Sequence, residues 1–208
     1  MSNHVAIATV TAVLRHVLQG ALDDADPGVP GARVGTARIN AQPPEFPVPG
    51  VNLFLYQSTP SAMLRNADLP ARRSDGTAAH RPRVPLDLHY IVSFHGNDAH
   101  FEPQILLGIV TRALHEQPVL TRKAIEDTLL DTSLPFLQKS DLADADEPVR
   151  FSQIGLSADE LSRLWSTFFQ TPYVLSMVYR ASVVTLDGAA PAHAAPPVRV
   201  TRVRADRT

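Results

Sequence analysis

Residues 86–95 read L-D-L-H-Y-I-V-S-F-H, a run in which apolar and polar side chains alternate. Successive side chains of a β-strand point to opposite faces of its sheet, so this alternation predicts a strand with one apolar face. The apolar face consists of Leu86, Leu88, Tyr90, Val92 and Phe94. Ile91 alone breaks the alternation. We therefore expect another layer of the protein to pack against one face of this strand.

Further runs predict strands that can join it in a sheet. Residues 50–57, G-V-N-L-F-L-Y-Q, are apolar on both faces, which favours a central position. Residues 173–186 alternate as well, but over a greater length than most strands have. Part of this strand is expected to project beyond the sheet and to offer an edge to a neighbour. Shorter strands are expected near 33–38 and 149–154.

Apolar side chains also recur at helical spacing in three segments, which predicts helices near 4–21, 102–116 and 158–169. Pro103 suits the first turn of the second helix. Ser157 and Glu160 have the spacing of a capping box before the third, and Thr121 can cap a shorter helix. The predicted fold is a single α/β (α+β) domain, in which helices flank a mixed, largely antiparallel sheet. The order of the strands stays open.

Composition limits the possible functions. A length of 208 residues suits one domain, and a hydrophobic content of 44% excludes disorder of the whole chain. The formal net charge of -2 provides no basic field, so no nucleic-acid partner is expected. The absence of cysteine excludes a disulfide scaffold and a cysteine nucleophile. No apolar stretch is long enough to predict a membrane span, and no signal peptide is expected.

Proline suggests where the folded part ends. The chain has 18 prolines, and they are dense between residues 43 and 85 and again after Gly188. Proline fixes φ and has no N–H, so these stretches are predicted to be loops. Residues 58–85 are expected to form one long loop. We expect a folded domain over 1–187 and a flexible, proline-rich tail over 188–208.

Charges of opposite sign gather in two segments. Residues 58–85 carry five arginines and two aspartates, whereas 126–147 carry seven acidic residues and one lysine. Complementary charge favours one arrangement of two protein surfaces. The two segments could equally meet within one chain. Our interface candidates from these segments are Arg65, Asp68, Arg72, Arg73, Arg81, Arg83, Asp141, Asp144, Asp146 and Glu147.

Four aromatic residues follow the capping box: Trp165, Phe168, Phe169 and Tyr173. The simplest interpretation is that they belong to the core. The second is an interface, because aromatic residues are enriched there. On that second interpretation Trp165, Phe169 and Tyr173 join the interface candidates.

No common catalytic motif is present: the chain has no G-x-S-x-G, P-loop, G-x-G-x-x-G or H-E-x-x-H sequence. A metal site can be drawn from three histidines, His89, His95 and His100. A catalytic triad can be drawn from Ser74, Asp75 and His80, and the arginines of the long loop could bind phosphate. The simpler interpretation of each group is a solvated surface, so we expect no catalytic residue, cofactor or metal.

The exact wording of four segments is more informative than the spacing of their apolar residues. The segments are P-G-V-N-L-F-L-Y-Q-S-T-P-S-A-M-L-R-N-A-D-L-P-A-R-R (49–73), L-D-L-H-Y-I-V-S-F-H-G (86–96), E-P-Q-I-L-L-G (102–108) and L-W-S-T-F-F-Q-T-P-Y-V-L-S-M-V-Y-R-A-S-V-V (164–184). Together they resemble the cap, or tail-terminator, protein of extracellular contractile injection systems. These phage-tail-like bacterial particles are typified by the Photorhabdus virulence cassettes and the antifeeding prophage.

The resemblance implies a non-enzymatic structural protein. It implies a homo-hexameric ring that sits on the last rings of the inner tube protein and the sheath protein, ends their growth and closes the particle. Assembly would take place in the cytoplasm, and the particle would then be released. No catalytic residue comes with this family, and the tail after Gly188 is assigned no role in it. The alternatives are another adaptor or baseplate protein of such a particle, or an enzymatic or ligand-binding α/β domain.

Overall fold

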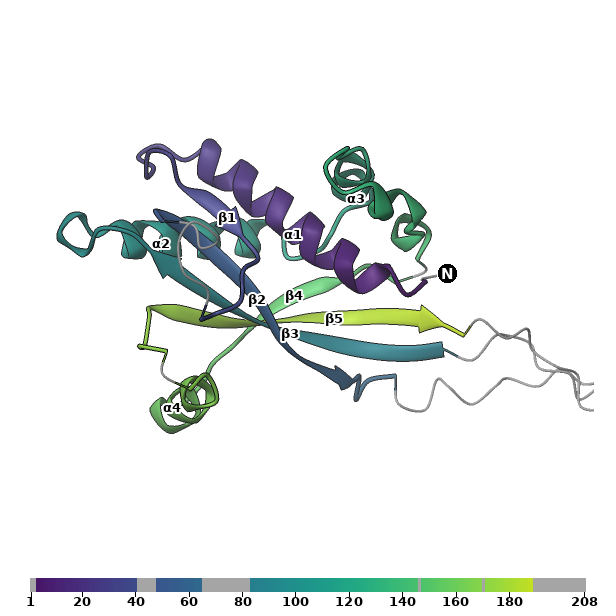
Figure 1. Ribbon diagram of the computed structural model, residues 1–208. Helices are drawn as coiled ribbons and strands as arrows, with labels where there is room; N and C mark the ends of the chain where they lie inside the picture. The colour runs from purple at the N-terminus through teal and green to yellow at the C-terminus, as the bar shows by residue number, and fades with distance from the viewer. Residues whose placement is uncertain (1–2, 41–47, 65–82, 146, 170, 189–208) are drawn as a thin grey trace, which may run out of the picture.

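The computed structural model describes residues 3–40, 48–64, 83–145, 147–169 and 171–188. Five strands form one sheet in the order β1-β2-β3-β5-β4. The pairing of β1 with β2 is parallel, and the other three pairings are antiparallel (Figure 1). The mixed, largely antiparallel sheet is thereby confirmed. The strands are β1 (Arg33–Gly35), β2 (Gly50–Pro60), β3 (Arg83–His95), β4 (Arg150–Ile154) and β5 (Ser176–Asp187).

Helices cover both faces of this sheet. The described helices are α1 (Ala6–Asp23), α2 (Glu102–Glu116), α3 (Arg122–Leu129) and α4 (Ala158–Ser166), with three short 3₁₀ turns, η1 (Asp98–His100), η2 (Pro135–Lys139) and η3 (Leu142–Asp144). The main core lies between the sheet and α1 with α2. A smaller core lies under α4, on the opposite face (Figure 1).

The predicted starts of α2, α3 and α4 are confirmed, whereas α1 begins at Ala6 without a side-chain cap. Ser157 Oγ accepts a hydrogen bond from the Glu160 N–H at 3.3 Å, and Glu160 Oε2 accepts one from the Ser157 N–H at 2.9 Å. Thr121 Oγ1 accepts from the Ala124 N–H at 3.2 Å, and Pro103 stands in the first turn of α2. Each contact satisfies an N–H that the first turn of a helix leaves without an internal partner.

The position of Ile91 explains why it breaks the alternation of β3. Leu88, Tyr90 and Val92 are fully buried on the side of α1 and α2. Ile91 is fully buried on the other side, where it packs with Trp165 of α4. Strand β3 is therefore covered on both faces at this point, and an apolar residue is favoured on each face.

Three predicted boundaries are wrong. Residues 58–85 do not form one continuous loop, because β2 continues to Pro60 and β3 begins at Arg83. Strand pairing holds Pro60 and Pro85 in the sheet, and the Ser61 N–H donates to the Pro85 carbonyl at 2.9 Å. Helix α4 ends at Ser166, so Phe169 lies beyond it. The strand predicted over 173–186 begins only at Ser176, so Tyr173 lies before β5.

A histidine on β3 makes the stability of the fold depend on pH. Burial lowers the pKa of His95 from its usual 6.5 to about 4, and its Nε2 lies 2.9 Å from Ser93 Oγ. Between these two values the unfolded chain binds a proton that the folded chain does not bind. The free energy of unfolding should therefore fall, by at most about 3 kcal/mol, as the pH drops from 7 to 4.

The test is urea unfolding of the wild type and of His95→Gln across this pH range. His115→Gln, on an exposed turn of α2, is the matched control. We expect His95→Gln to have a shallower loss of stability than the wild type and the control to keep the wild-type slope. Equal slopes for all three proteins would contradict the assignment to His95.

Candidate functional site

The clearest candidate surface surrounds the end of α4, where four aromatic residues form what we call the aromatic patch: Trp165, Phe168, Phe169 and Tyr173. Trp165 anchors it, because only 6% of its surface is exposed and its Nε1 donates to Ser176 Oγ at 3.2 Å. Its ring meets Phe168 and Tyr173 edge to face, at centroid distances of 6.2 and 5.3 Å. Such pairs stabilise a fixed arrangement of rings. Trp165 is thus part of the core, as the simpler interpretation of the sequence predicts.

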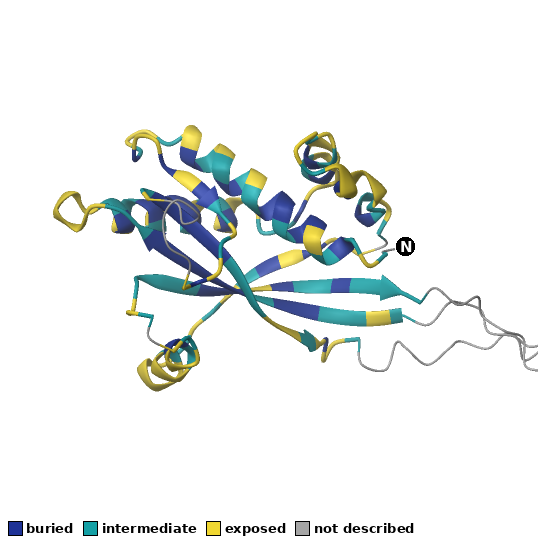
Figure 2. Cartoon of the chain, viewed as in Figure 1, coloured by how far each residue is buried: buried dark blue, intermediate teal, exposed yellow. Residues whose placement is uncertain are grey.

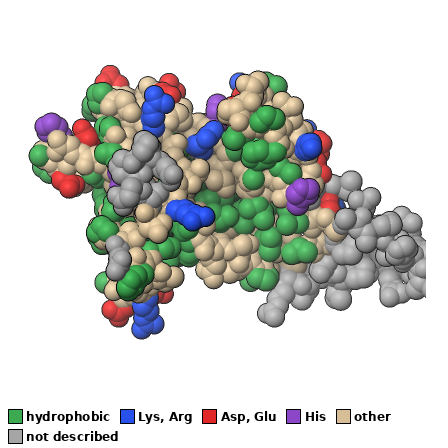
Figure 3. Space-filling view, in the orientation of Figure 1, with side chains coloured by type: hydrophobic (Ala, Val, Ile, Leu, Met, Phe, Trp, Pro, Cys, Tyr) green, Lys and Arg blue, Asp and Glu red, His purple; other side chains and the backbone are tan. Residues whose placement is uncertain are grey.

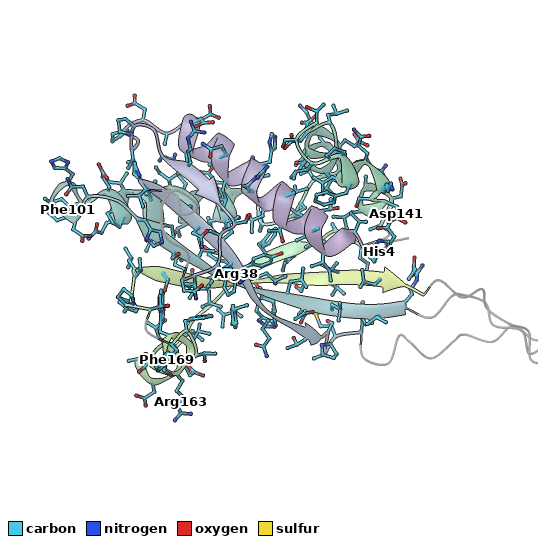
Figure 4. All side chains as sticks on the ribbon, viewed as in Figure 1. His4, Arg38, Phe101, Asp141, Arg163 and Phe169 are labelled. Carbon is cyan, nitrogen blue, oxygen red and sulfur yellow. The ribbon has the colours of Figure 1, made fainter. Side chains whose placement is uncertain are left out.

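The two outer members of the patch are exposed to solvent. Phe169 is 82% exposed and Tyr173 is 58% exposed. Figure 4 shows Phe169 at the α4 end of the molecule, and hydrophobic side chains are visible around it in the space-filling view (Figure 3). The expectation that they belong to the core is therefore wrong for these two residues. Exposed aromatic residues held on a rigid base are typical of the sites that dominate binding between proteins.

An arginine lies beside the patch. Arg38, Phe54 and Phe169 line an open hollow of about 530 Å³ together with neighbouring residues. Phe54 on β2 meets Phe168 edge to face at 5.8 Å, so the hollow has a firm apolar wall. Arginine and aromatic side chains are both enriched at protein interfaces. The hollow is therefore suited to an apolar group with an acidic or carbonyl neighbour.

A buried asparagine positions this part of the site. Asn52 on β2 is fully buried, and its Oδ1 accepts from the Ala37 N–H at 2.9 Å. Its Nδ2 donates to the Ala37 carbonyl at 3.1 Å. The segment that follows brings Ile39 against Trp165 and leaves Arg38 exposed. Sequence reasoning missed Arg38 and Asn52, although one asparagine within the apolar run 50–57 was a usable signal.

The acidic candidates lie at the other end of the molecule, near the start of α1. Figure 4 labels Asp141 near His4, at the start of α1. Asp141 Oδ1 accepts from the Asn3 N–H at 2.7 Å, and Asp144 forms an ion pair with Arg122 at 3.3 Å. Both carboxylates therefore have partners in their own chain, and Glu147 is exposed. Their participation in assembly stays a prediction.

Six of the charged interface candidates lie outside the residues that the structure describes. They are Arg65, Asp68, Arg72, Arg73, Arg81 and Asp146. The three residues from which a catalytic triad can be drawn, Ser74, Asp75 and His80, lie outside the described residues as well. Arg83 is described, and its Nε lies 3.2 Å from Asp187 Oδ1, which links the ends of β3 and β5. The structure therefore does not bring the basic and acidic segments together at any described contact.

The three histidines of the drawn metal site do not converge. His89 Nε2 lies 2.9 Å from Thr59 Oγ1, His95 contacts Ser93, and His100 is in the exposed turn η1. Burial lowers the pKa of His89, which favours its neutral form. Within the described ranges there is no group of three side chains able to hold a metal ion. No helix in those ranges has the length and apolar character needed to cross a membrane.

The aromatic patch separates residues that hold the fold from residues free to bind. Trp165→Ala should lower the free energy of unfolding by about 3 to 5 kcal/mol, because it leaves a cavity under α4. Phe169→Ala should change it by less than about 0.5 kcal/mol, because the side chain is exposed. Urea unfolding at neutral pH measures both values. Equal losses would show that Phe169 is structural.

Comparison with known proteins gives a family and a fold. Residues 9–200 match the family described as Pvc16 N-terminal domain. The sheath/tube terminator of the PVC extracellular contractile injection system, in its extended state, has a TM-score of 0.57 at 15% identity, over 97% of this chain and 64% of that chain. The tube-terminating cap of the anti-feeding prophage has a TM-score of 0.55 at 13% identity, over 94% of this chain and 60% of that chain.

These likenesses show a shared fold. The chain spans less than two thirds of the length of either terminator. No curated protein matches the chain.

Proposed function

Because the chain belongs to the Pvc16 N-terminal domain family, we propose that it is a structural terminator of a contractile injection particle. The observation that carries this proposal is the shared fold with a sheath/tube terminator over 97% of the chain. The protein would bind the last ring of the inner tube and of the sheath and end their growth. It would act by occupying a surface, without making or breaking a covalent bond.

A ring is the form that suits this task. A tube end built from a cyclic arrangement of subunits presents one binding site per subunit, and a matching ring of caps can contact all of them at once. Joining the copies makes each further contact intramolecular, so weak single contacts add to a strong attachment. We propose a homo-hexamer in which a patch of one copy meets a different patch of the next. Once the ring is seated, no further tube or sheath subunit can add.

The aromatic patch and the charged segments have separate tasks in this proposal. The exposed rings of Phe169 and Tyr173 supply the binding energy, and the charge of Arg38 fixes the orientation of the bound partner. The basic residues of the 58–85 segment and the acidic residues around Asp144 set the arrangement of neighbouring copies. Residues 1–187 act as the terminator domain, and 188–208 act as an appended tail. Assembly takes place in the cytoplasm, before the particle is released.

The test uses growing tubes of the inner tube protein from the same particle. Adding the wild-type chain should shorten the tubes, because capped ends no longer grow. Phe169→Ser should require at least about tenfold more protein for the same shortening, since a central aromatic contact contributes about 2 kcal/mol or more. Tube lengths measured by electron microscopy give the result.

Phe136→Ser is the matched control, because Phe136 is also exposed but lies on η2, away from the patch. It should cap as the wild type does. Tubes whose lengths do not respond to the wild-type chain would contradict the proposed function. A Phe136→Ser defect equal to that of Phe169→Ser would contradict the role of the patch alone.

A further inference from the structure

The sheet narrows to three strands at one end. Strand β4 pairs with β5 only between Val178 and Ser182, and β1 pairs with β2 only between Gly50 and Asn52. Beyond them, among the described residues, only β2, β3 and β5 continue, and we call residues 57–60, 83–89 and 183–187 the arm. Only the ends of β3 and β5 reach past the helices in Figure 1, and Val184 on the arm is still buried in the main core. Most residues of the arm are intermediate in burial (Figure 2). Val84, on the arm, is 50% exposed.

Two hydrogen bonds fix the direction of the backbone groups of β3. The Ser61 N–H donates to the Pro85 carbonyl at 2.9 Å, so the backbone carbonyl of Pro85 points toward β2. The Phe94 N–H donates to the Leu175 carbonyl at 3.0 Å, so Phe94 faces the side of β5. Backbone groups alternate in direction along an antiparallel strand. The backbone N–H and C=O groups of odd-numbered residues of β3 therefore point toward β2, and those of even-numbered residues point toward β5.

This rule identifies the outward groups of β5. Leu86 and Val84 are even-numbered, so their partners Val184 and Leu186 direct their N–H and C=O groups toward β3. Thr185 lies between these partners and directs its N–H and C=O away from β3. Among the described residues no strand pairs with β5 on that side beyond Ser182.

The same rule identifies the outward groups of β2. Ser58 pairs with Leu88, which faces β5, so the Ser58 N–H and C=O point to the outer edge of the sheet. Pro60 pairs with Leu86 and also points outward. A proline is tolerated there because its missing N–H is not needed inside the sheet. No described strand pairs with β2 on this side beyond Asn52.

The open edge of β5 has the composition of a strand that pairs. Residues 183–186 read V-V-T-L, without charge and without proline. Natural proteins usually protect an open edge with charged residues or proline, because an unprotected edge attracts another strand. The outward backbone groups of Thr185 and Ser58 therefore meet no strand within the described part of one copy.

We propose that neighbouring copies of this chain pair through their arms, with the outer edge of β5 of one copy against the outer edge of β2 of the next. Both strands are antiparallel to β3, so they run in the same direction and lie on opposite sides of the same arm. A rotation about one axis then brings β5 of each copy beside β2 of its neighbour, and repeated rotation closes a ring without open edges. This inference rests on the proposed ring and names the surface that joins its subunits.

Two registers of β5 against the β2 strand of the neighbouring copy can be compared, and one of them satisfies more backbone groups than the other. With Thr185 opposite Gln57, the Ser58 N–H of the neighbour donates to the Thr185 carbonyl. With Thr185 opposite Thr59, that carbonyl would meet Pro60, which has no N–H. Thr185 and Gln57 pair with odd-numbered residues of β3, so their side chains share one face of the sheet, and Ser58 points to the other face.

The chain has no cysteine, so engineered cysteines report this contact directly. Within one copy, positions 57 and 185 lie on either side of β3, about 10 Å or more apart, which is too far for a disulfide. Under mild oxidation, Gln57→Cys combined with Thr185→Cys should give a ladder of covalent oligomers that ends at the closed ring, and reductant should abolish it. Ser58→Cys combined with Thr185→Cys is the matched control, expected to give at least tenfold less product.

A second pair of variants tests the hydrogen bonds themselves. Thr185→Pro removes the outward N–H, whereas Thr185→Val keeps it in a side chain of the same shape. We expect Thr185→Pro to weaken ring formation at least tenfold and Thr185→Val to leave it unchanged. Thermal unfolding checks that both variants are folded, and native mass spectrometry counts the copies.

Each other outcome overturns the inference in a recognisable way. A covalent dimer from Thr185→Cys alone would show two β5 edges meeting about a two-fold axis. Wild-type rings without cross-linking of the 57/185 pair would place the contact elsewhere, and the proposed function would stand. Failure of the wild type to form rings with or without tube would remove both the inference and the ring on which it rests.

Discussion

Strand β3 is the element on which the rest of the structure depends. It is paired on both edges, and its central part is buried on both faces, by Leu88, Tyr90 and Val92 on one side and Ile91 on the other. Such a strand is stable only if separate layers cover it. Helices α1 and α2 form one layer, and α4 with Trp165 forms the other.

The two layers are unequal, and the unequal coverage creates the candidate surfaces. Helix α4 is short and ends at Ser166, so it covers only part of its face and leaves Phe169 in solvent. The arm also has two outer strand edges, on β2 and β5, with which no described strand pairs. Exposed rings and open strand edges are both unfavourable on an isolated protein, and both are satisfied by contact with other subunits. On the proposed function, neighbouring subunits cover these surfaces.

Local features of the fold could be predicted from the sequence. The alternation in residues 86–95 gives β3, and the Ser157–Glu160 capping box gives the start of α4, because each signal lies within a few residues. The strand order 1-2-3-5-4 could not be predicted, since it depends on pairing between distant segments. The length of the strand predicted at 173–186 indicates that part of β5 projects beyond the sheet. The ends of β2 and β3 that accompany it were missed because Pro60 and Pro85 are typical of loops, and only the strand register shows how the sheet accepts them.

The candidate site was predictable in part. The aromatic run after α4 drew attention to Phe169, but helical spacing predicted that its ring would be buried. Its exposure follows from where the helix ends, which is the least certain feature of a sequence pattern. Arg38 was missed because its position depends on the hydrogen bonds between Asn52 and Ala37, which lie 15 residues apart in the chain.

The central claim is that this protein ends a cylinder by its shape alone. Electron micrographs of particles from cells that lack the chain test it most directly, with particle length and the state of the ends as the readout. We expect tubes and sheaths of uneven length with open ends, and we expect the wild-type chain supplied in trans to restore uniform length and closed ends. Particles of normal, uniform length with closed ends would contradict it.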